Sequence, residues 1–363
     1  MTAPAAAHPL ASAARRLAAD VLAPAAETAE RDGVTPDAVA ALKASGVLGV
    51  LGPAGYGGAG APDAVAREIG ETLAAACCST FFVQAQHHTP VRALAAADAP
   101  VRERLLRPLC DGTLLAGVAY SHLRAFPRVP VRAAPLPGGG WRFDGRVPWY
   151  TGWGLNDVML IAGITEGGAG ASGPEVVFAF AGARPRPGLT PTAPLALAAL
   201  TGTRTVALEL AGLTVPADAV VRHLPYARWA ELDRPMNTNA SPAVFGVARA
   251  ALDLLDAASD PHAREAAAAL RPRLDQARRE AYALADREPD PECLAARLAV
   301  KTRAYELLRA ATTAAVVAGG GHALLLGDPA QRLAREALFL LVQGQTREVR
   351  TAHLRTLAAP PAS

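Results

Sequence analysis

The stretch Gly138–Thr165, GGGWRFDGRVPWYTGWGLNDVMLIAGIT, decides the fold of this chain, because it has the pattern of a β-hairpin followed by a strand. The three glycines 138–140 predict a turn, and Asp144-Gly145 is a two-residue hairpin signal. Trp149-Tyr150-Thr151 then places two aromatic rings and a hydroxyl on a short extended segment. Val158–Ile164 is a near-continuous apolar run of the buried-strand type. We therefore expect a sheet in this part of the chain.

The surrounding sequence divides into three zones. Residues 1–114 have helical periodicity, whereas residues 115–224 are rich in Gly, Pro and β-branched residues with a period near two. Residues 225–363 are helical again, with breaks near Ser259–Pro261 and Gly319–Gly321. Segregated helices and strands are typical of an α+β fold. We predict an N-terminal helical domain (1–114), a central β-domain (115–224) and a C-terminal helical bundle (225–363).

Composition excludes several classes of protein. The chain has 363 residues, 51% of them apolar, so it can bury proper cores and is not disordered. A net charge of +3 gives no basis for nucleic-acid binding. The four cysteines, Cys77, Cys78, Cys110 and Cys293, lack metal-site spacing, so no metal is expected. With no apolar run of membrane length and no secretory pattern at the start, we expect a cytoplasmic protein that does not enter the membrane.

Further motifs lie in a characteristic order along the chain. Leu48–Gly58 ends in Tyr-Gly-Gly, and Leu109–Ser121 reads as a helix that enters a strand. Thr203–Asp218 reads as a pair of strands with a Val-Pro exit, and Val316–His322 as a late helix with a Gly-Gly turn. Together with the 138–165 segment, they resemble the acyl-CoA dehydrogenase superfamily over essentially the whole chain. The resemblance implies N-terminal helices, a central β-domain, a C-terminal four-helix bundle and an FAD cofactor.

The resemblance also implies where a flavin would be bound. Tyr120 and Ser121 at the first strand, and Trp149 and Thr151 at the second, match positions that donate hydrogen bonds to the flavin ring in the family. An isoalloxazine ring needs a flat apolar wall and a few donors, which an indole and hydroxyls can supply. The alternative is that the aromatic residues are simply the core of the β-domain. The order of the motifs favours the flavin.

Glycines near the end of the chain are a second group of cofactor positions. Gly319-Gly320-Gly321 is not a dinucleotide-binding fingerprint, and by itself it is typical of a helix end followed by a turn. In the family, equivalent glycines let the backbone approach the adenosine diphosphate half of a neighbouring subunit's FAD. By this resemblance Gly319, Gly320 and Gln345 are expected to contact the cofactor, although the family's glutamine before the glycines is Val316 here.

The position of the catalytic base departs from the family. Dehydrogenases of this superfamily take the α-proton of an acyl thioester with the glutamate of a Tyr-Glu-Gly-Thr motif. The corresponding residue here is Gln343, and an amide cannot act as a general base at neutral pH. Some relatives carry the glutamate on the first bundle helix, which corresponds to a position near Met236, and Glu231 and Asp233 lie close to it.

Other polar positions depart from the family or allow several interpretations. Ser121-His122 replaces the family's Thr-Glu, and an Arg-x-x-Phe-Gly motif that holds the partner subunit's flavin has no clear match between Ala257 and Ala283. The pair His87-His88 could face a substrate cleft or cap a helix end. Adjacent histidines point to different sides of a helix, so they are poorly placed to share a metal.

The sequence thus predicts an FAD-dependent oxidoreductase acting on the CH–CH group of an acyl thioester. Two alternatives stay open because of Gln343: a reduced-flavin-dependent monooxygenase of the same fold, or a non-catalytic subunit that pairs with a complete dehydrogenase. Leu307–Ala318 carries Arg309 as its only charge, too little for full exposure. We therefore expect a homodimer or homotetramer joined through the C-terminal helices, or a mixed tetramer.

Overall fold

A computed structural model describes residues 5–98, 100–166, 173–287 and 291–358. The chain forms two compact units, which are described separately. The first comprises Met1–Ile69, Ser79–Leu197 and Thr201–Ala230, and the second comprises Gly70–Cys78, Ala198–Leu200 and Glu231–Ser363. The first unit therefore contains most N-terminal helices and the sheet, and the second contains the C-terminal helices.

The N-terminal zone is helical, as predicted. Its helices begin with local signals: Thr35 accepts a hydrogen bond from the Ala38 amide as the N-cap of α3, and Pro36 follows at the first helical position. The longest of them, α5, continues through Pro90. The helices are α1 (Pro9–Leu17), α2 (Ala23–Asp32), α3 (Pro36–Ala44), α4 (Asp63–Ala76), α5 (Cys78–Ala95) and α6 (Pro100–Cys110), with a π-helical turn at Ala18–Leu22.

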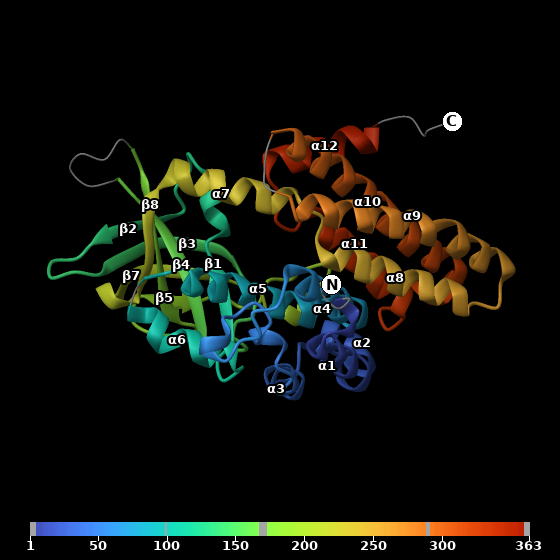
Figure 1. Ribbon diagram of the computed structural model, residues 1–363, viewed down its shortest axis with the longest axis horizontal. Helices are drawn as coiled ribbons and strands as arrows, with labels where there is room; N and C mark the ends of the chain where they lie inside the picture. Colours follow the sequence, from blue (N-terminus) through green and yellow to red (C-terminus); the bar gives the residue numbers. More distant parts are fainter. Residues whose placement is uncertain (1–4, 99, 167–172, 288–290, 359–363) are drawn as a thin grey trace. The chain divides into compact units, whose positions relative to one another are not determined.

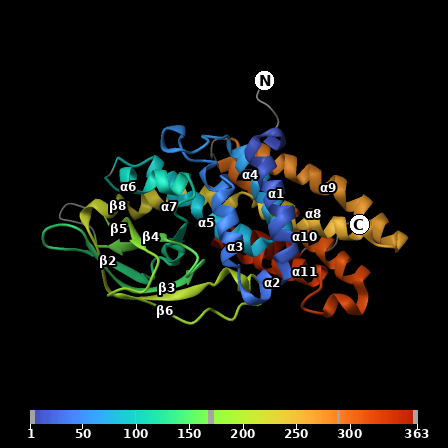
Figure 2. The ribbon, with the colours of Figure 1, turned by 90° about the horizontal axis from the view of Figure 1, so that it is seen from below.

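One mixed sheet forms the rest of the first unit (Figures 1 and 2). Its order is β6-β7-β3-β2-β4-β5-β8, and β1 pairs in parallel with β4. Phe143, Tyr150 and Leu208 are among its fully buried side chains. The strands are β1 (Ala116–Ala119), β2 (Val131–Pro135), β3 (Trp141–Tyr150), β4 (Val158–Thr165), β5 (Glu175–Gly182), β6 (Leu189–Pro191), β7 (Val206–Val215) and β8 (Val220–Pro225).

Two local predictions in the β-domain are wrong. Asp144-Gly145 is not a hairpin turn, because β3 runs through it and Gly145 pairs with Val131 on one side and Leu210 on the other. The turn before β3 lies instead at Gly138–Gly140, as the glycines indicated. The two expected strands within Thr203–Asp218 are one strand, β7, whose register shifts opposite Phe143 and Asp144. In both places, pairing with neighbouring strands outweighs the local turn signal.

The second unit is built from C-terminal helices, of which α8–α11 lie side by side (Figure 1). Ser241, Asp260 and Asp328 cap three of them, each followed by a proline at the first helical position. Over the described residues, no single helix is long and apolar enough to cross a membrane. One bent pair of helical segments, Cys293–Leu324 and Pro329–Val342, has the necessary length and apolar composition only when the two are taken together. The helices are α7 (Tyr226–Thr238, which begins in the first unit), α8 (Pro242–Ala257), α9 (Pro261–Ala285), α10 (Pro291–Gly319), α11 (Pro329–Val342) and α12 (Arg347–Ala358).

The predicted α+β fold, with helices before and after a central sheet, is confirmed. All described strands lie between Ala116 and Pro225. The domain limits at residues 114 and 224 stay predictions.

Candidate functional site

Two of the expected flavin contacts lie at the end of β1. The strand Ala116–Ala119 is made of small apolar residues and is mostly buried. Tyr120 then turns the chain into a short 3-10 helix, and its ring packs edge-on against Phe178 at 5.4 Å between centroids. Ser121 is half-buried, and among the described residues its hydroxyl has no hydrogen-bond partner. The Ser121 hydroxyl is therefore available to a ligand.

The other two expected contacts lie at the end of β3, where exposure alternates. Trp149 is 54% exposed, whereas Tyr150 is fully buried and burial raises the pKa of its phenol. Trp149 is thus not a core residue, and its indole presents a flat apolar surface. The Thr151 hydroxyl is buried and shares a hydrogen bond with Thr205 at 3.2 Å, and Thr205 in turn bonds to Thr203. That hydroxyl is already engaged within the sheet.

A residue that the sequence did not single out lies between the end of β3 and β1. Asn156 donates from its side-chain amide to the Thr151 carbonyl (2.8 Å) and to the Tyr150 hydroxyl (3.1 Å). A Cβ on Gly117 would lie 2.3 Å from the Asn156 amide nitrogen and 2.7 Å from the Tyr150 oxygen. The end of β3 therefore rests against β1 at Gly117, a few residues before Tyr120 and Ser121.

His122, which stands where the family has an acidic residue, is buried and neutral. Its Nε2–H donates to the Ala162 carbonyl at 3.1 Å, and burial lowers its pKa to about 4. No partner for its Nδ1 exists among the described residues. The buried imidazole therefore carries no charge at neutral pH.

The pair His87-His88 lies inside α5, so the interpretation that it caps a helix end is wrong. His87 is fully buried and bonded at both ring nitrogens, to Leu109 and Ala116. His88 contacts Gln84, and burial lowers its pKa to about 4. Over the described residues, no group of three or more His, Cys, Asp and Glu side chains could hold a metal ion.

In the second unit, the position of the expected base lies at the end of α11. Gln343 is the C-cap residue, and its amide donates to the Phe339 carbonyl at 3.0 Å. Gly344 follows with φ +64°, and a Cβ there would lie 3.1 Å from the Asn237 side-chain oxygen. The Gln345 amide is 3.5 Å from the Leu341 carbonyl. The turn thus carries two amide side chains and no carboxylate.

A bonded carboxylate on α7 is linked to this turn. Asn237, which touches Gly344, donates from its side-chain amide to the Asp233 carboxylate at 3.0 Å. The buried ammonium of Lys301 donates to the main-chain carbonyl of Asn237 at 2.7 Å. Asp233, one of the two acidic residues near the alternative base position at Met236, is therefore linked to the turn at Gly344.

The glycines after α10 are open to solvent. Gly319 and Gly320 are exposed, Gly320 has φ +57°, and a Cβ on Gly320 would meet no atom within 4 Å. A groove of about 740 Å³ runs along α10 in the same unit. Small apolar residues form its floor, and Asp260, Glu306 and Arg309 are among its charged lining residues.

Comparisons with known proteins fit this geometry. Residues 5–113 match the N-terminal domain of acyl-CoA dehydrogenases. Butyryl-CoA dehydrogenase from Megasphaera elsdenii has a similar structure, with a TM-score of 0.83 at 18% identity and 99% of each chain covered. Dibenzothiophene monooxygenase from Paenibacillus sp. A11-2 gives a TM-score of 0.80 at 19% identity, with 97% of each chain covered. That monooxygenase has also been solved with FMN and indole, at 18% identity, a TM-score of 0.80 and the same coverage.

The fold is therefore that of the acyl-CoA dehydrogenases, over the whole length of the chain. Together with the N-terminal match, it agrees with the resemblance to the acyl-CoA dehydrogenase superfamily that the motifs indicated. No curated protein matches the chain in sequence. Solved relatives of this fold include both dehydrogenases and a monooxygenase.

Proposed function

We propose that the protein is a flavin-dependent oxidoreductase that works as a reduced-flavin monooxygenase on a small organic substrate. The observation that carries this proposal is Gln343 at the end of α11, where the resemblance implies a glutamate base. Monooxygenation does not require removal of an α-proton, whereas dehydrogenation of an acyl thioester does. A monooxygenase is among the relatives of the same fold.

Residues of the first unit suit a flavin ring. Trp149 would provide its apolar wall, and the unpartnered Ser121 hydroxyl would donate to a ring heteroatom. The Thr151 hydroxyl would have to turn away from Thr205 to do the same. When bound, the flavin supplies redox chemistry that no side chain can supply: oxygen activation when reduced, and hydride acceptance when oxidised. The protein's part is to bind, orient and shield the ring.

The flavin that we propose is FAD, with Gly319, Gly320 and Gln345 contributing to its binding within an oligomer. The open backbone at Gly320 supports this assignment, because nothing in its own unit covers it. One relative holds FMN, so the two flavins must be distinguished by measurement. Chromatography of the flavin released from denatured protein separates FAD from FMN. Release of FMN alone would replace FAD in the proposal.

The second candidate is the acyl-thioester dehydrogenase that the resemblance implies. Asp233 favours it, because this carboxylate is linked through Asn237 to the turn at Gly344. A carboxylate so placed could take over the task of the missing glutamate. If Asp233 is the base, the wild-type protein should oxidise acyl-CoA thioesters and the Asp233→Asn variant should not. Glu231→Gln, on the same helix, should leave this oxidation unchanged.

Anaerobic flavin bleaching by a panel of acyl-CoA thioesters tests the two candidates. For a monooxygenase, we expect no bleaching by the wild type or by Gln343→Glu, together with reoxidation of the reduced flavin by oxygen at a rate that indole alters. For a dehydrogenase that uses Asp233 as its base, the wild type itself should be bleached. For a dehydrogenase that has lost its base, Gln343→Glu should raise the bleaching rate about 10²–10⁴-fold. Gln331→Glu, with the same charge change on the same helix α11, is the control. A colourless protein would leave the non-catalytic subunit, which pairs with a complete dehydrogenase.

We also propose that the protein is cytoplasmic and forms a homodimer or homotetramer through its C-terminal helices. The second unit exposes several large apolar side chains: Val317 is 74% exposed, Leu324 70% and Leu326 72%. Surfaces of this kind are usually covered by another subunit. Light scattering at micromolar concentration tests the proposal, and a monomer would contradict it. A mixed tetramer would require co-purification with a second, complete subunit.

A further inference from the structure

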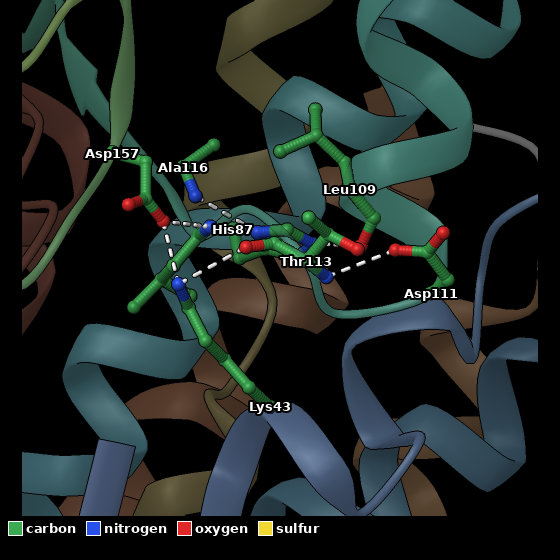
Figure 3. A network of polar contacts seen from close by, with 8 residues as sticks. Lys43, His87, Leu109, Asp111, Thr113, Ala116 and Asp157 are labelled. Carbon is green, nitrogen blue, oxygen red and sulfur yellow. Dashed lines mark hydrogen bonds and ion pairs between the residues drawn. The ribbon is translucent and has the colours of Figure 1, made fainter. Parts of the chain in front are cut away.

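His87 is a buried imidazole that the proposed chemistry does not use. Its Nδ1 accepts a hydrogen bond from the Ala116 amide at 3.0 Å, and its Nε2 lies 3.1 Å from the Leu109 carbonyl. An amide donates and a carbonyl accepts, so the proton of the neutral ring is on Nε2. Burial lowers the pKa of His87 to about 3, which keeps the ring neutral over the physiological pH range. The ring therefore joins the end of α6 to the first residue of β1 (Figure 3).

A second set of bonds fixes the residues just before β1. The Asp157 carboxylate accepts from the Leu115 amide and from the Lys43 ammonium, both at 2.7 Å. Lys43 also donates to the Thr113 carbonyl at 3.2 Å, and Asp111 accepts from the Thr113 amide at 2.9 Å (Figure 3). Side chains from α3, from α5, from Asp111 and from Asp157 just before β4 thus converge on the segment 113–116.

The register of β1 decides where the proposed flavin contacts lie. Ala116 pairs with Val158, and the strand leads directly to Tyr120 and Ser121. A slip of one residue would move Ser121 by about 3.3 Å, more than a hydrogen bond tolerates. The strand consists of Ala, Gly, Val and Ala, so its own side chains offer little to hold the register.

We propose that His87 is a positioning residue that fixes the register of β1 and thereby places the Ser121 hydroxyl and Tyr120 in the flavin site. The inference rests on the proposed flavin site. The first part of the inference, that His87 fixes the register of β1, does not depend on a bound flavin. The acceptor at Nδ1 is the essential atom, because it bonds the strand itself, whereas Nε2 bonds the helix end.

Two substitutions separate the two ring nitrogens. His87→Asn keeps an acceptor near Nδ1, and His87→Gln keeps a donor near Nε2 but leaves the buried Ala116 amide unsatisfied. Amide hydrogen exchange of residues 116–119 in flavin-free protein should rise about tenfold in His87→Gln and little in His87→Asn. The flavin dissociation constant should rise about tenfold in His87→Gln alone, with loss of the fine structure of the bound flavin's visible spectrum.

Leu94→Ala is the control for general destabilisation, because Leu94 is a fully buried residue of the same helix. It should lower stability without changing the flavin spectrum of the folded protein. The inference is overturned if the Asn and Gln variants behave alike, or if exchange rises in His87→Gln while flavin affinity and spectrum stay as in the wild type. If the wild type binds no flavin, the proposed function fails, and the exchange measurement still decides whether His87 fixes the strand.

Discussion

Each unit has a buried polar centre, and the two solve the problem of burial in opposite ways. In the first unit, His87 is buried without charge, and two main-chain groups satisfy its ring nitrogens. In the second, the Glu71 carboxylate is completely buried, and charged side chains surround it. A neutral buried ring needs two hydrogen bonds, whereas a buried anion needs matching cations as well.

The second unit supplies those cations from two bundle helices. Arg278 bonds the Glu71 carboxylate at 2.6 Å, the Tyr282 hydroxyl donates to the same oxygen at 2.5 Å, and Arg249 lies 3.2 Å from the other oxygen. The Arg278 guanidinium also lies over the Tyr282 ring at 5.0 Å. Ion pairs therefore stabilise the buried Glu71 carboxylate. Removing its charge should lower the free energy of unfolding more than a substitution near His87 does.

The largest expected effect is that of Glu71→Gln. The amide keeps the shape but leaves two arginines without their counter-ion, which should lower the free energy of unfolding by about 3 kcal/mol. Glu280→Gln is the control, because Glu280 forms a surface pair with Arg303 and should cost less than about 1 kcal/mol. Chemical denaturation of both variants measures the difference. Equal losses would mean that the Glu71 centre contributes no more than a surface pair.

The next effect concerns the chain that leads into β1. Gly112 and Gly138 both have φ +82°, but a Cβ on Gly112 would lie 2.2 Å from the Lys43 carbonyl oxygen, whereas nothing lies within 4 Å at Gly138. Alanine at either position costs about 1 kcal/mol for the backbone conformation. Gly112→Ala should cost about 1 kcal/mol more, because the backbone of α3 must move. If Gly112→Ala and Gly138→Ala lost similar stability, the backbone around Gly112 would be able to move at little cost.

The third effect is the response to acid. The pKa of His87 in the folded protein, about 3, is below the value of 6.5 in the unfolded chain, so the unfolded chain takes up a proton first as pH falls. His87 therefore destabilises the fold progressively from pH 6.5 down to about 3, by at most about 1.4 kcal/mol per pH unit. His87→Gln should flatten the dependence of unfolding free energy on pH by that amount. An unchanged slope would mean that His87 is charged or exposed in the native protein.

The same contrast explains what sequence alone could and could not reveal. Helical periodicity and the apolar run Val158–Ile164 depend on local sequence, and they predicted the fold correctly. The Asp144-Gly145 turn failed because pairing between strands, which local sequence does not encode, decides that position. Periodicity predicts a helical zone over residues 1–114 but not the limits of α5, whose apolar and polar residues show almost no segregation to opposite faces and which contains Pro90.

The buried polar centres could not be predicted from the sequence for a related reason. Glu71 looks like any surface glutamate on an amphipathic helix, and its partners come more than 170 residues later. Asn156 and Asp157 belong to no spacing motif, although they connect β1, β3 and α3. Tyr120, Ser121, Trp149 and Thr151 were found through family resemblance, and their contact with a flavin stays a prediction. The exposure of Trp149 emerged from the structure alone.

The smallest expected effect is that of Lys43→Met, which removes the cation beside Asp157. The Lys43 side chain is 24% exposed and that of Asp157 is 38% exposed, so solvent screens their attraction. We expect a loss of about 0.5 kcal/mol, which should shrink further in 1 M salt. Asp157→Ala should cost more, because it also removes the acceptor of the Leu115 amide, and that additional loss should not respond to salt. If Lys43→Met instead cost as much as Glu71→Gln, the first unit would depend on a charged centre just as the second does, and the contrast between the two units would fail.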